Sequence, residues 1–269
     1  MSWITAKRRR PVANYAVVLL GLILVGAVYA TITGSGNSAA ATDPTASQSQ
    51  IAQGQAIFEQ TCATCHGLEA QGTSVAPGLI GVGAAAVDFQ VSTGRMPLRE
   101  PGPEAPRKPP QLNRAQTIAV AQYIQSLGGG PPIPTAEQVS TLGANLALGQ
   151  ELFTANCEQC HNFDGAGGAL TFGKYAPALT ASTPTQIYEA MLTGPEAMPV
   201  FNDTTLTPQN KRDIIAFVTA TRAQGNPGGF SLGRIGPVTE GLVAFLGLLF
   251  FMVLAAMWIT AKHRKTTNE

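Results

Sequence analysis

A duplicated segment constrains the fold of this chain more than any other feature. The stretch that begins at Ile51 reads IAQGQAIFEQTCATCHG, and the stretch that begins at Leu146 reads LALGQELFTANCEQCHN. Glycine, glutamine, phenylalanine and the pattern Cys-x-x-Cys-His recur in register, and the two pentapeptides hold all 4 cysteines and two of the 3 histidines. This agreement indicates an internal duplication, so we expect two similar domains.

Later landmarks recur in the same order in both halves. A Pro-x-Leu step is followed by a Met-Pro step, at Pro77 and Met96 in the first half and at Pro177 and Met198 in the second. Capping residues then predict helices that start after Asn113, Thr183 and Thr207, with Gly194 ending the second of them. Because no run of alternating residues indicates a strand, we expect each half to be all-α.

Two uncharged apolar stretches lie near the ends of the chain. They cover 12–32 and 241–259, and as helices they would measure about 31 and 28 Å, close to the thickness of a bilayer core. Basic residues precede the first stretch and follow the second, which places both termini in the cytoplasm and the middle of the chain outside it. A cleaved signal peptide is the alternative for the first stretch, and a buried core helix is the alternative for the second.

These features divide the chain into nine segments. We expect a basic cytoplasmic N-terminus (1–11), a transmembrane helix or uncleaved signal anchor (12–32), a linker (33–50), a first domain (51–128), a linker (129–145), a second domain (146–222), a linker (223–237), a transmembrane helix (238–260) and a cytoplasmic tail (261–269). Residues 34–237 contain 10 Lys plus Arg against 14 Asp plus Glu, a net charge of −4. This acidic balance argues against a nucleic-acid partner.

Three chemistries use the Cys-x-x-Cys-His pattern. Two such motifs could pool their ligands around a structural zinc ion, or each cysteine pair could form a redox disulfide. In the third, both thiols attach a haem covalently and the adjacent histidine binds its iron. A disulfide would not need the histidine, and a zinc site would leave the Met-Pro steps unexplained. We therefore expect two covalently bound haem c groups, one on Cys62 and Cys65 and one on Cys157 and Cys160.

The iron ligands follow from a count of the available side chains. His66 and His161 are the proximal ligands, and the third histidine lies in the C-terminal tail. A methionine or an open position is left for the distal side. Met96 is the candidate in the first half, while Met198 competes with Met191 in the second. We favour Met198 because it stands before a proline, as Met96 does, whereas Met191 belongs to the apolar stripe of a predicted helix and suits core packing.

Several further residues are candidates for supporting roles. The carbonyls of Pro77 and Pro177 could accept the N–H of the proximal imidazoles, or these could be ordinary turn prolines. Arg95 and Tyr175 could meet haem propionates, although a solvated arginine is the simpler interpretation. The proline-dense segment 101–110 has no equivalent in the second half and is expected to be an ordered surface loop, with a partner-docking segment as the alternative.

These motifs resemble a known family. Phe58, CATCH at 62–66, PGL at 77–79 and GRMP at 94–97 look like a small class I cytochrome c domain, and the second half repeats them. With the insertion at 98–110 and a terminal anchor helix, the whole chain is similar to the dihaem cytochrome c subunit of the cytochrome bcc complex (menaquinol-cytochrome c reductase) of Gram-positive respiratory chains.

That resemblance implies a function and a set of partners. In that family the subunit lies beside cytochrome b and a Rieske iron-sulfur protein in a menaquinol-oxidising translocase. It passes electrons from the Rieske cluster to the CuA subunit of a cytochrome c oxidase within a supercomplex in the cell membrane. The subunit itself would then be an electron carrier without catalytic residues. An independent membrane-tethered dihaem shuttle and a dihaem peroxidase remain alternatives, and a peroxidase would need an open distal position on one haem.

Overall fold

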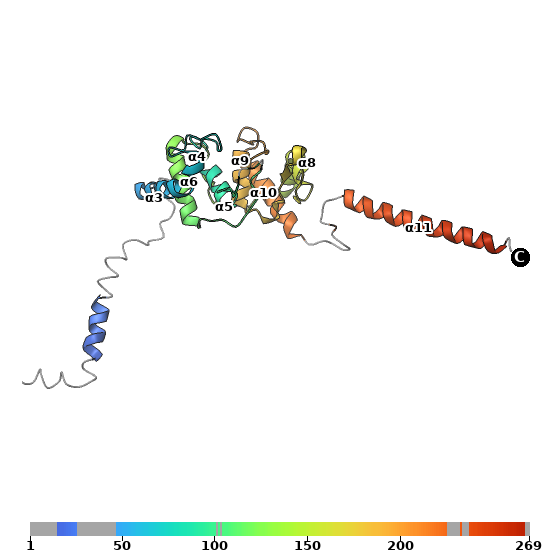
Figure 1. Ribbon diagram of the computed structural model, residues 1–269, viewed down its shortest axis with the longest axis horizontal. Coiled ribbons are helices and arrows are strands. Elements are labelled where there is room, and N and C mark those ends of the chain that lie inside the picture. The colour runs from blue at the N-terminus through green and yellow to red at the C-terminus, as the bar shows by residue number, and fades with distance from the viewer. Residues whose placement is uncertain are drawn as a thin grey trace, which may run out of the picture. The chain divides into compact units, whose positions relative to one another are not determined.

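The computed structural model describes residues 15–25, 47–100, 102, 104–224, 232 and 237–266 (Figure 1). It falls into two units, 1–46 and 47–269. The described part of the first unit is an apolar helix, Tyr15–Val25, whose side chains are exposed. This helix is shorter than the about 20 residues that cross a bilayer. The rest of the predicted first span, 12–14 and 26–32, lies outside the described residues.

A long apolar helix forms the C-terminal part of the second unit. Helix α11 (Pro237–Thr266) includes 24 residues, Val238–Ala261, with a mean hydropathy of 2.7 and no buried part in its most apolar window. Because these side chains are exposed, α11 is not a core helix of this chain. Its length and composition suit a membrane span, as predicted for 238–260.

The first repeat folds around two crossing helices. Its helices are α3 (Gln48–Thr61), α4 (Ala63–His66), α5 (Ala84–Ser92) and α6 (Arg114–Gly128). Helices α3 and α6 pack together, and the Phe58 and Tyr123 rings lie 5.4 Å apart in a core that includes Ile124. Helix α3 is capped by the Ser47 side chain and begins at Gln48, within the segment 33–50 that was predicted to be a linker.

The second repeat uses the same crossing. Its helices are α7 (Leu146–Asn156), α8 (Glu158–His161), α9 (Pro184–Thr193) and α10 (Pro208–Ala223). Helices α7 and α10 pack together, and the Phe153 and Phe217 rings lie 5.3 Å apart, close to the 5.4 Å between Phe58 and Tyr123 in the first repeat. The phenylalanine that recurs in the sequence therefore anchors the same aromatic pair in each domain.

The recurring glycine has a steric cause. A Cβ atom on Gly54 would lie 2.0 Å from the carbonyl oxygen of Ala119 in α6, and one on Gly149 would lie 2.1 Å from that of Asp213 in α10. Both distances are far below van der Waals contact. Any side chain at these two positions would push the crossing helices apart, so glycine is required for their close approach.

The predicted helix starts are confirmed, and two parts of the fold were missed. Asn113, Thr183 and Thr207 cap α6, α9 and α10, and Gly194 ends α9 in the left-handed conformation. The expectation of an all-α second half was wrong in one detail, because β1 (Gly168–Ala169) pairs with β2 (Tyr175–Ala176), near the short 3-10 helices η2 (Thr171–Gly173) and η3 (Leu179–Ala181). Strands of two residues are too short to show alternation.

Helix α5 was not predicted either, and it joins the domains. Six of its nine residues are buried, so it lacks the polar face that an amphipathic pattern needs. It packs against α6 of its own domain and against α9 of the second domain (Figure 1). The proline-dense segment adds contacts there: the Ala105 N–H donates to Glu196 Oε1 over 2.9 Å, and Arg107 Nη2 donates to Gln186 Oε1 over 3.1 Å.

Candidate haem-binding sites

The first Cys-x-x-Cys-His motif forms a tight turn at the end of α3. The Cys62 N–H donates to the Phe58 carbonyl over 2.8 Å, and α4 then carries Cys65 and His66 through one further turn. The His66 Nδ1 lies 2.7 Å from the Pro77 carbonyl oxygen. Because a carbonyl only accepts, Nδ1 carries the proton and Nε2 keeps a free lone pair for a metal. Of the two interpretations left open for Pro77, this contact supports the acceptor role over an ordinary turn proline.

The second motif repeats that geometry. The Cys157 N–H donates to the Phe153 carbonyl over 2.7 Å, and His161 Nδ1 lies 2.9 Å from the Pro177 carbonyl oxygen. Burial lowers the pKa of His161, and the bond to Pro177 opposes that effect only in part. The imidazole is therefore held neutral and oriented, which is the form in which histidine binds a metal.

The surroundings of the cysteines distinguish between the three chemistries. Burial, together with the neighbouring cysteine of each motif, raises the pKa of Cys62 to about 11 and that of Cys157 to about 12. Thiols that exchange disulfides have a lowered pKa instead, so redox exchange is disfavoured. Within the described ranges, no three His, Cys, Asp or Glu side chains come close enough to hold a metal ion, so the two motifs do not pool into a zinc site.

A cavity opens beside the second motif. Its lining includes Cys157, Cys160 and His161 on one side and Met198 from the loop after α9. The remaining walls are largely apolar and include Phe153, Leu179, Ile187, Phe201, Ile214 and Val218. An apolar cavity lined by two thiols, an oriented imidazole and a thioether fits a covalently attached haem.

Both methionines of the second half line this cavity, but they lie in different settings. Met191 belongs to α9, is 2% exposed and packs in the core of the domain with Tyr188 and Ile215. Met198 is half-buried in the loop beyond Gly194, where its N–H donates to the Pro195 carbonyl over 3.0 Å. The choice of Met198 as the distal ligand stays a prediction, and the core position of Met191 is the one expected for a packing residue.

In the first domain, Met96 contacts the same apolar cluster as Cys62 and Leu79. Its N–H donates to the Gln90 carbonyl over 3.0 Å, which ties the loop of Met96 to the end of α5. The structure thus brings Met96 and the first motif to one core, as the order of the landmarks predicted.

The two candidates for a propionate contact both line the cavity of the second domain, and for Arg95 the simpler interpretation of a solvated side chain was wrong. Arg95 is not solvated: it is 7% exposed, and it lines the cavity of the second domain together with Phe89 and Glu104, all three from the first half. Tyr175 also lines this cavity and is 52% exposed. No sequence signal indicates that residues of the first half line the cavity of the second, because the repeat suggests that each half builds its own site.

Comparison with known proteins agrees with this geometry. The family model "Cytochrome c" matches residues 51–128, and the model "Cytochrome C oxidase, cbb3-type, subunit III" matches residues 144–218. The cytochrome bc1 complex cytochrome c subunit of Corynebacterium efficiens is 41% identical over 271 residues, which cover 95% of this chain and 91% of that protein. The chain belongs to the family of cytochrome bc1 complex cytochrome c subunits. It therefore carries covalently bound haem c and transfers electrons.

Other relatives define how far the similarity extends. The cytochrome bc1 complex cytochrome c subunit of Mycobacterium tuberculosis is 40% identical over 260 residues, which cover 94% of this chain and 92% of that protein. A cbb3-type cytochrome c oxidase subunit FixP of Bradyrhizobium is 34% identical over 139 residues, which cover 48% of this chain and 44% of that protein. The similarity to bc1 cytochrome c subunits thus covers 94 to 95% of the chain, whereas the similarity to FixP covers 48% of it.

Proposed function

We propose that this chain relays electrons from the Rieske iron-sulfur protein of a menaquinol-oxidising cytochrome bc complex to the CuA subunit of a cytochrome c oxidase in a supercomplex. The observation that carries the proposal is the repetition of one ligand geometry in two packed domains of a membrane-anchored chain. Each domain has a Cys-x-x-Cys-His turn, an imidazole bound to a proline carbonyl and a methionine on the same core or cavity. Two such sites in series suit a relay between fixed partners.

In this proposal the residues of each site have defined roles. Cys62 and Cys65 in the first site, and Cys157 and Cys160 in the second, each add a sulfur to one carbon of a vinyl double bond and a hydrogen to the other. His66 and His161 are the proximal ligands, and Met96 and Met198 are the distal ligands. Haem c supplies an iron that gains and loses one electron.

The ligand set explains why the chain would transfer electrons rather than catalyse a reaction. One histidine and one methionine would hold the iron of each haem, which would raise its reduction potential and leave no place for oxygen or peroxide to bind. The Pro77 and Pro177 carbonyls hold the imidazoles in one orientation, so the ligand sphere changes little between the two oxidation states. A peroxidase would need the opposite, a distal position that opens.

Membrane attachment supports a fixed relay rather than a diffusing carrier. We place both termini in the cytoplasm and both haem domains outside it, with α11 and the stretch 12–32 crossing the membrane. The support is the basic residues that flank the two apolar stretches. A tethered chain cannot travel between complexes, so its partners must lie within reach of its two domains.

Affinity purification in mild detergent tests the assignment to a complex. Tagged full-length chain is expected to co-purify with cytochrome b, the Rieske protein and oxidase subunits, and addition of a menaquinol analogue should reduce both haems. A haem-loaded chain that purifies without cytochrome b and the Rieske protein would support an independent shuttle instead. Rapid binding of carbon monoxide to the reduced chain would indicate an open distal position and contradict the relay.

A further inference from the structure

The cavity beside the second motif is not built by the second domain alone. His161 and Met198 come from that domain, but Phe89, Arg95 and Glu104 come from the first. The Arg95 guanidinium lies 4.9 Å from the centre of the Phe89 ring, so the two side chains form one wall. This wall lies where α5 packs against α9.

Arg95 has an unused donor at this wall. Its side chain is 8% exposed, and its Nη1 is buried without a hydrogen-bond partner among the described residues. An unpaired donor of a buried charged group is costly, because the water that it gave up is not replaced. A buried arginine with a free N–H on the lining of a cavity indicates an acceptor that belongs in that cavity.

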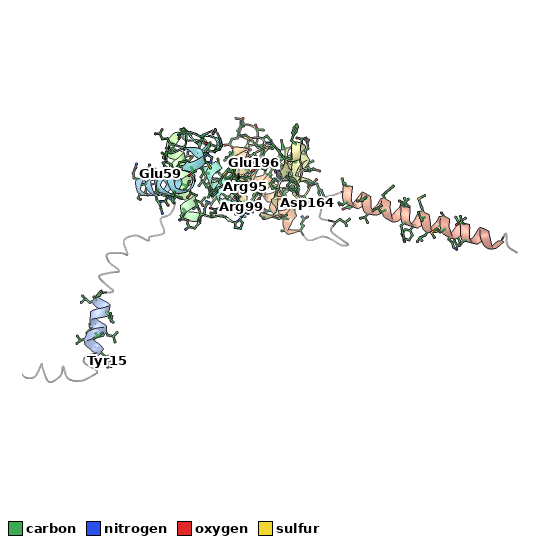
Figure 2. The ribbon with its side chains drawn as sticks, viewed as in Figure 1. Tyr15, Glu59, Arg95, Arg99, Asp164 and Glu196 are labelled. Atoms are coloured by element: carbon green, nitrogen blue, oxygen red, sulfur yellow. The ribbon has the colours of Figure 1, made fainter. Side chains whose placement is uncertain are left out.

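The nearby carboxylates do not fill this role. Glu196 lies near Arg95 (Figure 2). It approaches only at Nε, with 4.0 Å between Nε and Oε1, and this Oε1 already accepts the Ala105 N–H. Glu104 is also engaged, because its Oε1 accepts the Tyr175 N–H over 2.8 Å. Neither carboxylate is a hydrogen-bond partner of Nη1. A carboxylate placed in the cavity would suit this donor, because charged acceptors make the strongest hydrogen bonds with a guanidinium.

We propose that Arg95 is a positioning residue, supplied by the first domain, that binds a propionate carboxylate of the haem held in the second domain. The proposal rests on the proposed function, since it requires a haem at the second motif. Arginine is suited to a carboxylate because its planar group offers two parallel N–H donors.

Under this proposal, adjacent residues of the first domain connect the two haem sites. Arg95 is bonded directly to Met96, the distal ligand proposed for the first site. One dipeptide then contacts both haem sites, through its arginine in one domain and its methionine in the other. Loading of the second site would also tie the first domain to the second, which explains why the chain brings a buried cation to this interface.

Reduction potentials of the full-length chain in its purified complex test the proposal. Wild type, Arg95→Gln, Arg95→Lys and Arg107→Gln are titrated spectroelectrochemically, and Met198→His marks the second haem because loss of methionine ligation lowers its potential. Arg107→Gln is the matched control: it removes the same charge and an interdomain hydrogen bond, but Arg107 does not line the cavity.

Arg95→Gln is expected to lower the potential of the second haem and leave the first unchanged. An uncompensated propionate favours the ferric state, and we expect about a tenfold change in the ferric-to-ferrous ratio, equal to about 59 mV for one electron. Arg95→Lys keeps the charge and should restore most of the potential. A shift no larger than that of Arg107→Gln, or a shift of the first haem only, would overturn the proposal.

A second readout applies if Arg95→Gln does not accumulate. The propionate-bending bands of the second haem in the resonance Raman spectrum should then move in Arg95→Lys, because an ammonium replaces the two-pronged contact. Unchanged bands would equally overturn the role of Arg95. If the wild-type chain did not show two reversible haem c redox transitions, the proposed function would fail. That result differs from an unaltered second haem in the Arg95 variants, which would overturn only the role of Arg95.

Discussion

At the scale of single residues, the distal ligand of the second site is the sharpest question. Met198 lies in a loop, and Met191 lies in α9 and packs in the domain core, yet both line the cavity. We predict that Met198→Ala removes about half of the methionine-to-ferric-iron charge-transfer band in the near infrared, because one of two methionine-ligated haems loses its ligand. Near-infrared magnetic circular dichroism of the full-length chain measures this.

The matched control for this prediction is Met191→Leu. Leucine keeps the volume of the core position, so we expect the band to stay at full intensity with a stability change below about 1.5 kcal/mol. The opposite pattern, with the band halved in Met191→Leu and intact in Met198→Ala, would reassign the ligand. Met96→Ala should remove the other half of the band.

At the scale of helices, the repeated glycines make a prediction about both domains. Gly54→Ala should destabilise the first domain and Gly149→Ala the second, by about 1 to 3 kcal/mol each, because a Cβ would overlap a carbonyl of the facing helix. Calorimetric unfolding of the haem-loaded chain in detergent measures the change.

Exposed neighbours on the same helices provide the controls. Gln53→Ala in α3 and Gln150→Ala in α7 change side chains that lie on the solvent side. Alanine favours helix slightly at such positions, so we expect unfolding temperatures equal to or just above wild type. If the glycine variants matched these controls, the crossings would be looser than the structure indicates.

At the scale of the whole molecule, two buried carboxyl groups lie close together where α5 of the first domain packs on α9 of the second. Asp88 of α5 is fully buried and pairs with Arg114 of α6, while Glu189 of α9 is fully buried beside Asp88. Burial above all, then repulsion by Asp88 and a hydrogen bond with it, raises the pKa of Glu189 to about 10, although Arg114 opposes this. Glu189 is therefore protonated at neutral pH and can donate to Asp88.

This pair predicts that alkaline pH weakens the packed structure. In the unfolded chain Glu189 has the ordinary pKa of 4.5, whereas in the folded chain its pKa is about 10. Between these two pH values the unfolded chain has released a proton that the folded chain retains. Stability should therefore fall as pH rises through this window. We predict that Glu189→Gln, which can still donate to Asp88 but does not ionise, raises stability at pH 8 by about 1 to 3 kcal/mol and flattens the pH dependence.

Unfolding temperatures measured from pH 5 to pH 9 test this. Glu137→Gln, at an exposed carboxyl, is the control and should follow the wild-type curve. A Glu189→Gln curve parallel to wild type would show that Glu189 does not control the pH dependence.

The attachment of the chain to the membrane gives a further prediction at this scale. We expect a chain that lacks 238–269 to remain in the membrane fraction, because the 21 uncharged residues at 12–32 exceed the about 7 to 15 of a signal-peptide core. Replacing 1–32 by a known cleavable signal peptide provides the comparison, since that chain should be held by α11 alone. Release of the 238–269 deletion into the medium would identify 12–32 as a cleaved signal peptide.

Much of the fold was predictable because its signals are local. The caps at Asn113, Thr183 and Thr207 depend on residues within one turn. The repeated landmarks made the proline contacts of His66 and His161 candidates, but the structure was needed to choose them over ordinary turn prolines. Helix α5 was missed because a helix buried on two sides has no polar stripe. The β1–β2 pair was missed because two residues cannot show a period.

Four features could be read from the amino-acid sequence alone: the duplication, the two haem motifs, a histidine count that leaves a methionine or an open position on the distal side, and a C-terminal apolar stretch long enough to span a membrane. These features are written in spacing and composition, which do not depend on how the halves meet. The contacts between the halves came from the folded structure: Arg95 and Phe89 of the first half line the cavity of the second, and Asp88 lies beside Glu189. The physical reason is that α5 packs on α9, and a contact between separately encoded halves leaves no periodic trace in either.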